Sequence, residues 1–382
     1  MQTVGVICEY NPFHLGHARQ LELLRQKLGP ETAIVCLMSG NYVQRGEPAI
    51  FDKCVRARAA VEAGASLVLE LPVTYTLRSA EGFAAGGVEI FDRLGCIDGL
   101  SFGSELVDIN DIMSTAEALD STEFSEHLHD ALAEGLSFPA ARQQALAALG
   151  ADTAALETPN SILAVEYCKA LRRRNSTIVP MLLHRDGDYH GGSDPAAPAA
   201  SFLRVQADWT GFVPPEALEV FSGAVRHTAA AGERAWLARL RGMEEVEFSC
   251  LPFGSEGLWR KVMAACRTEP TIAAIVQAAK SKRYTHTRLM RMLLCAYLGI
   301  SEEMLMAPAP YVRVLAVNPR GQSVLRQAKK SGDLLLLHTG ERAPAGEYAA
   351  LERRAADLYS LFTTTENFAV NQERSARLFR AP

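Results

Sequence analysis

The chain has 382 residues, enough for two domains or for one large domain with a smaller companion. Hydrophobic residues make up 48 % of it and charged residues 22 %, proportions typical of a folded globular protein that argue against disorder. The net charge of −5 gives no general affinity for nucleic acid, so any RNA site must be a local basic patch.

The amino terminus carries no signal-peptide pattern, and no apolar run reaches the length of a membrane span. We therefore expect a cytoplasmic protein with no membrane partner. The eight cysteines are scattered singly, without a C-x-x-C pair, so we expect reduced and mostly buried thiols and no metal site. The sequence leaves the oligomeric state undetermined.

The first predicted elements are a strand, a tight turn and a helix. Residues 4–8 are an apolar run without alternation, typical of a strand covered on both faces. Asn11 and Pro12 end this strand, and leucines then recur at helical spacing as far as Leu28. A helix that begins just beyond a parallel strand directs N–H groups and a positive dipole end toward the crevice above the sheet, where anions bind.

Two histidines in this turn are suited to a phosphate group. His14 and His17 flank Gly16, and each imidazole can donate a hydrogen bond to a phosphoryl oxygen. The missing side chain at Gly16 lets a ligand approach closely. A chance pair of histidines is the alternative, and a zinc site is disfavoured because no third ligand lies nearby in the sequence.

The elements that follow alternate between strand and helix. Strands are predicted at 33–38, 66–71 and 99–105 and helices at 52–63 and 77–94, which indicates an α/β fold with a doubly wound, Rossmann-like parallel sheet. Loops at the carboxyl ends of such strands carry the site. In the loop 39–49, Arg45 is either a phosphate or substrate contact or an ordinary surface arginine. The small-residue turn at Gly103 lets a base or ribose lie against the backbone.

The remainder of the predicted catalytic domain, residues 1–205, contains a helical insertion at about 107–151. A helix then begins near Asn160, whose amide either caps the helix or binds a ligand. The next strand, 177–183, leads to Arg185, which we expect to contact phosphate or ribose unless it pairs with a neighbouring aspartate.

Residues 206–382 are predicted to form a mainly helical domain that also contains a small strand-bearing unit from about 312 to 339, to which we assign no chemistry. Its most basic element is 280–294, which on a helix would present a cationic surface to an RNA backbone, or simply a solvated face. The residues that this RNA-binding prediction names are Lys282, Arg283, Tyr284, Arg288 and Arg291.

The H-x-G-H pattern after the first strand resembles the signature of the HIGH nucleotidyltransferase superfamily, and the string G-V-I-C-E-Y-N-P-F-H-L-G-H (5–17) closely resembles one branch, the tRNA(Met) cytidine acetate ligases. The resemblance covers most of 1–204 and, more loosely, the K-R-Y-T stretch. It implies that ATP, with Mg²⁺, activates acetate to acetyl-adenylate and that the acetyl group passes to N4 of the wobble cytidine of elongator tRNA(Met), giving N4-acetylcytidine. The resemblance also implies that His14 and His17 are catalytic residues. The ATP-binding residues that it implies are Ile7, Cys8, Glu9, Tyr10, Asn11, Pro12, Phe13, His14, Leu15, Gly16, His17, Gln20, Gly103, Asn160 and Arg185.

One departure from the family concerns the second signature. Relatives carry a Ser-Ala-Thr-x-Ile-Arg-like segment that resembles a clamp on pyrophosphate; here only Ser201 and Arg204 match, and Ala199 stands where a serine is expected. The sequence assigns no general acid or base to the acetyl transfer. Two alternatives remain open: an enzyme that adenylates a small coenzyme precursor, and a non-catalytic RNA-binding protein that senses nucleotides.

Overall fold

The computed structural model describes residues 1–382 except 107, 152, 185–202, 205, 207 and 366–367. Its central feature is a sheet of eight strands in the order β10-β8-β5-β2-β1-β6-β7, with β9 alongside β8. The strands are β1 (Thr3–Cys8), β2 (Ala33–Ser39), β5 (Leu67–Leu71), β6 (Gly99–Ser104), β7 (Val179–His184), β8 (Tyr311–Val317), β9 (Leu335–His338) and β10 (Phe379–Arg380). A short hairpin, β3 (Tyr42–Val43) with β4 (Glu47–Pro48), lies in the loop after β2.

The doubly wound arrangement predicted from the sequence is confirmed. β1 pairs in parallel with β2 on one side and with β6 on the other, and β5 and β7 extend the parallel sheet outward from these neighbours. The strand order therefore reverses at β1. In such sheets the ligand crevice lies beyond the carboxyl ends of the two strands at the reversal, here β1 and β6.

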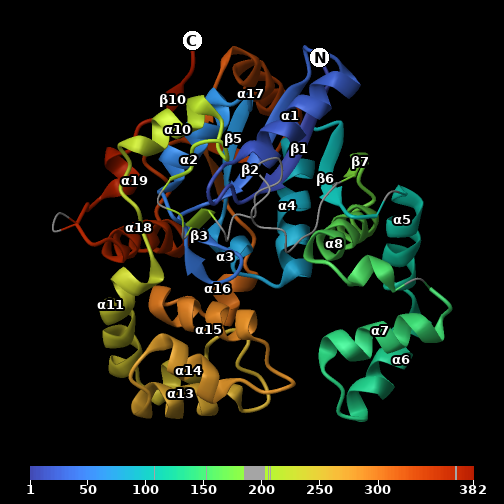
Figure 1. Ribbon diagram of the computed structural model, residues 1–382, viewed down its shortest axis with the longest axis vertical. Helices are drawn as coiled ribbons and strands as arrows, with labels where there is room; N and C mark the ends of the chain where they lie inside the picture. Colours follow the sequence, from blue (N-terminus) through green and yellow to red (C-terminus); the bar gives the residue numbers. More distant parts are fainter. Residues whose placement is uncertain (107, 152, 185–202, 205, 207, 366–367) are drawn as a thin grey trace.

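Helices cover both faces of the sheet, and central strands such as β2, β5 and β8 have buried apolar side chains on both faces (Figure 1). On one face, leucines of α1 and alanines of α2 pack with α10 against β1 and β2. On the other, α4, α8 and α17 pack against β2, β5 and β6. These helices are α1 (Leu15–Leu28), α2 (Lys53–Glu62), α4 (Ala80–Leu94), α8 (Pro159–Arg173), α10 (Pro215–Ser222) and α17 (Pro319–Ser331); the short α3 (Val73–Thr76) precedes α4.

The predicted insertion consists of three helices, α5 (Ile109–Ala118), α6 (Thr122–Ala133) and α7 (Phe138–Ala148). Helix α5 packs against α8, whereas α6 and α7 pack against each other and extend away from the sheet (Figure 1). No strand occurs within 108–151, as the sequence predicts.

The prediction of a separate carboxyl-terminal domain from residue 206 needs correction. β8 pairs antiparallel with β5, and β9 and β10 pair in parallel with β8, so the strands beyond residue 310 belong to the main sheet. The physical reason is that β5 would otherwise be an open edge, and β8 covers it with a fully buried strand.

The remaining carboxyl-terminal helices form a second core beyond the carboxyl ends of the parallel strands (Figure 1). They are α11 (Ala229–Gly242), α12 (Glu245–Ser249), α13 (Leu258–Thr268), α14 (Ile272–Ala279), α15 (His286–Leu298), α16 (Glu302–Met306), α18 (Glu347–Tyr359) and α19 (Gln372–Ser375). At Gly46, where φ is +82°, an added Cβ would lie 2.5 Å from the backbone of Met290 and Arg291. The loop after β2 is thus docked directly on α15.

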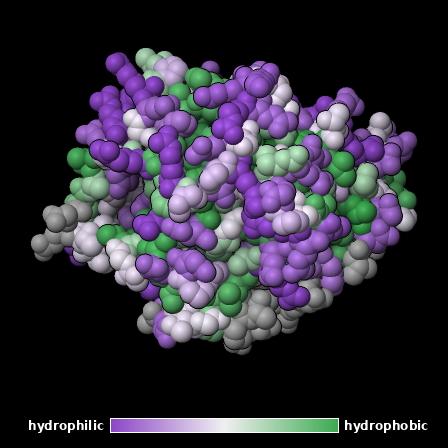
Figure 2. All heavy atoms as spheres, turned by 90° about the horizontal axis from the view of Figure 1, so that it is seen from above, coloured by the Kyte–Doolittle hydropathy of each residue, from purple (hydrophilic) through white to green (hydrophobic). Residues whose placement is uncertain are grey.

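Seen from the end at which β1 begins, the surface is mostly hydrophilic, with hydrophobic side chains in small scattered groups (Figure 2). Among the described residues, no helix is both long enough and apolar enough to span a membrane. All eight cysteines are free, and most are buried, as predicted.

Candidate active site

Residues 9–17, which we call the HIGH turn, connect β1 to the first turn of α1 and lie at the reversal point of the sheet. His14 is the N-cap of α1, and the rings of His14 and His17 stack with their centroids 3.6 Å apart. Nδ1 of His17 accepts the backbone N–H of His14 at 3.3 Å. A ring nitrogen that accepts carries no proton, so in the neutral imidazole the proton is on Nε2. His17 is therefore set to donate a hydrogen bond through Nε2.

The two histidines differ in exposure, which the sequence did not anticipate. His14 is only 4 % exposed, whereas His17 is partly accessible. An added Cβ at Gly16 would lie 3.1–3.2 Å from the His14 ring, so a side chain there would require the ring to shift slightly. That both imidazoles can face a phosphate stays a prediction; the His14 ring stacks on the His17 ring and is the more buried of the two.

The predicted ATP-binding run divides into buried and partly exposed residues. Asn11 is among the buried ones, and its Oδ1 accepts the N–H of Ile50 at 2.7 Å, which ties the turn to the next loop. The Leu15 N–H at the start of α1 donates to the carbonyl of Phe212. The buried residues are Tyr10, Asn11, Pro12, Phe13 and His14, and the partly exposed ones are Ile7, Cys8, Glu9, Leu15, Gly16, His17 and Gln20.

Glu9 lies at the end of β1 among arginines. Its Oε1 accepts the N–H of Gln44 at 2.6 Å. Burial raises the pKa of Glu9 above its usual value, against the opposing effects of the Gln44 N–H and of the positive charges on Arg56, Arg45 and Arg204. Arg45, Arg56 and Arg204 therefore all lie near the end of β1, and guanidinium groups are suited to phosphate or carboxylate.

Arg56, which the sequence reading treated only as part of a helix, is fully buried at this edge. Its guanidinium donates to the carbonyls of Phe51 (3.0 Å) and Ser39 (3.1 Å), and also to those of Glu9 and Gly40. It thereby joins the ends of β1 and β2. The sequence gives little signal for this burial, because Arg56 is one of four charged residues in α2, although its neighbours Val55 and Ala57 are apolar.

Of the second signature, Arg204 lies among the residues that the structure describes. Arg204 forms an ion pair with Glu47 at 2.7 Å, so the predicted clamp arginine is held by the loop that carries the exposed Arg45. Ser201, Ala199 and Arg185 lie outside the described residues.

The start of α8 adds a polar cluster opposite the HIGH turn. The N-cap is Thr158, which accepts the N–H of Ser161, so Asn160 does not cap the helix. Asn160 Nδ2 instead donates to Oε1 of Glu105 at 2.8 Å. Glu105 follows β6 two residues after the half-buried Gly103, and the sequence reading did not single it out.

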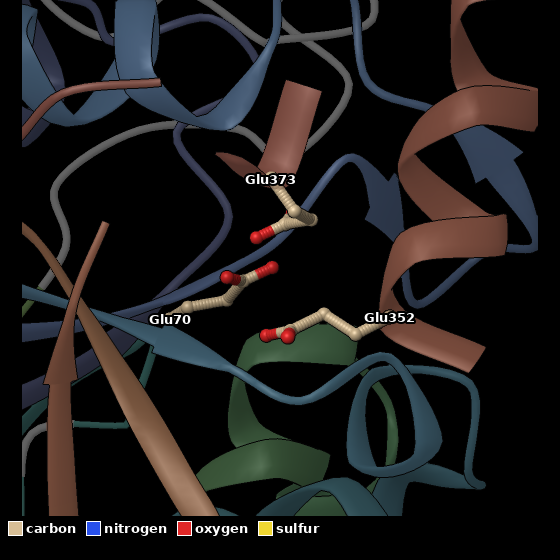
Figure 3. Close-up of side chains that lie close together, drawn as sticks. All are labelled: Glu70, Glu352 and Glu373. Atoms are coloured by element: carbon tan, nitrogen blue, oxygen red, sulfur yellow. The ribbon is translucent and has the colours of Figure 1, made fainter. Parts of the chain in front are cut away.

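One carboxylate cluster elsewhere has the proximity of a metal site. Glu70, Glu352 and Glu373 converge from β5, α18 and α19 (Figure 3). However, Lys53 Nζ lies 2.7 Å from Glu70 and also contacts Glu373, and Arg313 lies 2.6 Å from Glu352. Each of the three carboxylates contacts at least one of these two cationic side chains, so we interpret the cluster as a buried ion-pair network.

The predicted basic helix 280–294 is corrected in part. α15 begins at His286, so Lys282, Arg283 and Tyr284 lie in the turn before it. Arg291 is buried over the ring of Phe253, and burial lowers its pKa to about 10. Arg288 donates to the Phe253 carbonyl at 2.8 Å and stacks on Tyr284. Arg291 lies on the side of α15 that faces the core, so the predicted basic residues do not all lie on one exposed surface.

Comparison with known proteins supports the same interpretation. A family model described as HIGH Nucleotidyl Transferase matches residues 1–374. A tRNA(Met) cytidine acetate ligase of Clostridium novyi is 32 % identical over 87 % of this chain and 89 % of its own length. The chain belongs to the tRNA(Met) cytidine acetate ligase family of HIGH nucleotidyl transferases. A tRNA(Met) cytidine acetate ligase of Clostridium perfringens is 31 % identical across the whole of both chains. A crystal structure of Thermotoga maritima TmcAL bound with alpha-thio ATP superposes on the chain with a TM-score of 0.87, at 27 % identity and full coverage of both.

Proposed function

We propose that this protein uses ATP to activate acetate as acetyl-adenylate and then acetylates N4 of the wobble cytidine of elongator tRNA(Met). The observation that carries the proposal is the HIGH turn at the sheet reversal in a chain that aligns over its whole length with tRNA(Met) cytidine acetate ligases. The names of these relatives favour the ligase over a coenzyme-precursor adenylyltransferase and over a non-catalytic RNA-binding protein.

In the first step, an acetate oxygen attacks the α-phosphorus of ATP and the bond to pyrophosphate breaks. Negative charge on the phosphoryl oxygens must then be stabilised, and the protein needs to supply position and electrostatics more than covalent chemistry. We assign this stabilisation to Nε2 of His17 and to the arginines around Glu9, with Arg45 and Arg204 nearest the pyrophosphate. His14 holds the His17 ring in place.

Mg²⁺ is expected to accompany ATP. Among the described residues, the one cluster of three acidic side chains with suitable spacing already pairs with Lys53 and Arg313. We therefore expect the phosphates and water to hold most of the ion's coordination shell, as Mg²⁺ often requires in nucleotide sites.

For tRNA we propose the basic surface formed by the turn before α15 and by α13. Lys282 and Arg283 are exposed there, and Lys261 Nζ reaches the carbonyl of Lys280 at 3.4 Å. Arg260 stacks over Trp259, which adds an aromatic ring suited to a base or a sugar. The loop after β2, which carries Arg45, is docked on α15, the helix that follows this turn.

The test is to incubate the protein with ATP, labelled acetate and bulk bacterial tRNA and to look for N4-acetylcytidine in the digested tRNA. Labelled tRNA(Met) with acetate-dependent pyrophosphate release supports the proposal. Pyrophosphate release with a coenzyme precursor instead of acetate would replace it with the adenylyltransferase, and ATP binding without pyrophosphate exchange would replace it with the non-catalytic alternative.

A further inference from the structure

The turn after β6 places one carboxylate at the centre of the start of α8. Glu105 accepts hydrogen bonds from Thr158 Oγ1 (2.5 Å), Asn160 Nδ2 (2.8 Å) and Ser161 Oγ (3.1 Å). Ser104 Oγ lies 2.8 Å from Ser161 Oγ and completes the cluster. Partial burial acts to raise the pKa of Glu105, but these hydrogen bonds outweigh it and hold the pKa below its usual value. Glu105 is thus a carboxylate at neutral pH.

The charge of Glu105 determines how the Asn160 amide is oriented. An ionised carboxylate can only accept hydrogen bonds, so Asn160 must turn its NH₂ group toward Glu105. The amide is planar, and its Oδ1 consequently points away from Glu105 as an acceptor. Any ligand group that meets Asn160 through Oδ1 must therefore be a hydrogen-bond donor.

The position of this cluster relates it to the proposed nucleotide site. β6 is the neighbour of β1 across the reversal of the sheet, and Glu105 and the start of α8 follow its carboxyl end. Tyr167, farther along α8, is close enough to Cys8 and Glu9 for their charges to contribute to raising its pKa, although burial is the larger cause. Helix α8 therefore lies beside the ends of both β1 and β6, the two strands at the reversal of the sheet.

We propose that Glu105 is a positioning residue that fixes Asn160 as a hydrogen-bond acceptor and so selects a nucleotide with a donor at that point. The donor is either the 6-amino group of adenine or a ribose hydroxyl. This inference rests on the proposed ATP site and adds a source of nucleotide selectivity to it.

The test measures binding of ATP and of three analogues to the full-length protein by calorimetry. Purine riboside triphosphate lacks the 6-amino group, and 2′-deoxy-ATP and 3′-deoxy-ATP each lack one hydroxyl. We expect the unaltered protein to bind one of these analogues about tenfold more weakly than ATP, because Oδ1 of Asn160 loses its donor. The analogue that loses affinity identifies the group.

Glu105→Gln removes the constraint, since a glutamine amide both donates and accepts and so permits either orientation of Asn160. The tenfold preference should fall to about twofold. The double variant Glu105→Gln, Asn160→Asp restores a single orientation: the glutamine NH₂ donates to one aspartate oxygen, and the other remains an acceptor. It should recover the preference, which a merely structural role for Glu105 does not predict.

Asp108→Asn is the matched control, because it removes one negative charge three residues away. Asp108 caps α5 by accepting the N–H of Asn110, a bond that asparagine retains, and the selectivity should not change. An unchanged preference in Glu105→Gln, or no recovery in the double variant, would overturn this inference while ATP binding stands. Failure of the unaltered protein to bind ATP would overturn the proposed function as well.

Discussion

Replacing Lys53 with methionine should strongly destabilise the protein in a way that depends on pH. Lys53 is 5 % exposed, and its Nζ contacts two carboxylates, those of Glu70 and Glu373. Burial already raises the pKa of Glu70 to about 7 even with the lysine present. Methionine fills a similar volume but leaves Arg313 as the one remaining cation among three glutamates.

The size of the effect follows from two estimates that agree. Removing one partner from a buried ion pair costs about 3–5 kcal/mol. Alternatively, the variant takes up a proton on one more carboxyl group than the unaltered protein does, which costs about 1.4 kcal/mol for each pH unit above the unperturbed pKa of about 4.3. That is about 4 kcal/mol at pH 7.5 and under about 2 kcal/mol at pH 5.5. Because the folded variant then binds more protons than the unfolded chain, its stability rises as the pH falls.

Urea unfolding followed by circular dichroism at pH 7.5 and 5.5 measures both values. Arg58→Met is the control: Arg58 lies on the same helix, its side chain is 51 % exposed, and its ion pair with Glu62 spans 3.6 Å. The control should lose less than about 0.5 kcal/mol at either pH. A loss below about 1 kcal/mol for Lys53→Met at pH 7.5, or an equal loss at both pH values, would refute the reasoning.

Two further predictions concern the site and the tRNA surface. Gly16→Ala should lower the rate of acetate-dependent pyrophosphate exchange about tenfold, because its Cβ shifts the His14 ring, while the unfolding midpoint stays nearly constant; an unchanged rate would contradict the packing role of His14. Lys282→Ala should weaken tRNA binding and reduce the salt dependence, measured by filter binding across a KCl series, by somewhat less than one unit of slope. Arg291→Met should instead leave that slope unchanged and lower the free energy of unfolding, since Arg291 is buried.

Much of the sheet was predictable because strand formation here depends on local apolar runs. The run predicted at 33–38 matches β2 (Ala33–Ser39), and Asp52 caps α2 by accepting the N–H groups of Cys54 and Val55. The position of β8 was not predictable, because its pattern marks a buried strand without specifying a partner. Pairing with β5 joins residues about 250 positions apart, and only the folded chain determines it.

The candidate site was predictable in its motif but not in its supporting contacts. The spacing of His14 and His17 indicates a shared turn, but it does not show that the His17 ring stacks on His14 and also contacts the rings of Tyr10 and Phe13. Glu105 and Arg56 were missed because single charged residues carry no periodic signal. Their roles come from partners that are distant in sequence, such as Asn160 and the carbonyl of Glu9.

The most direct test of the central claim is acetate-dependent exchange of labelled pyrophosphate into ATP by His17→Ala, with His129→Ala as the control. His129 is an exposed histidine on α6, away from the HIGH turn. If Nε2 of His17 stabilises the phosphoryl charge, its loss raises the barrier by about 3 kcal/mol and slows exchange a hundredfold or more, while the control stays at the unaltered rate. Exchange by His17→Ala within about threefold of the unaltered protein would contradict the account.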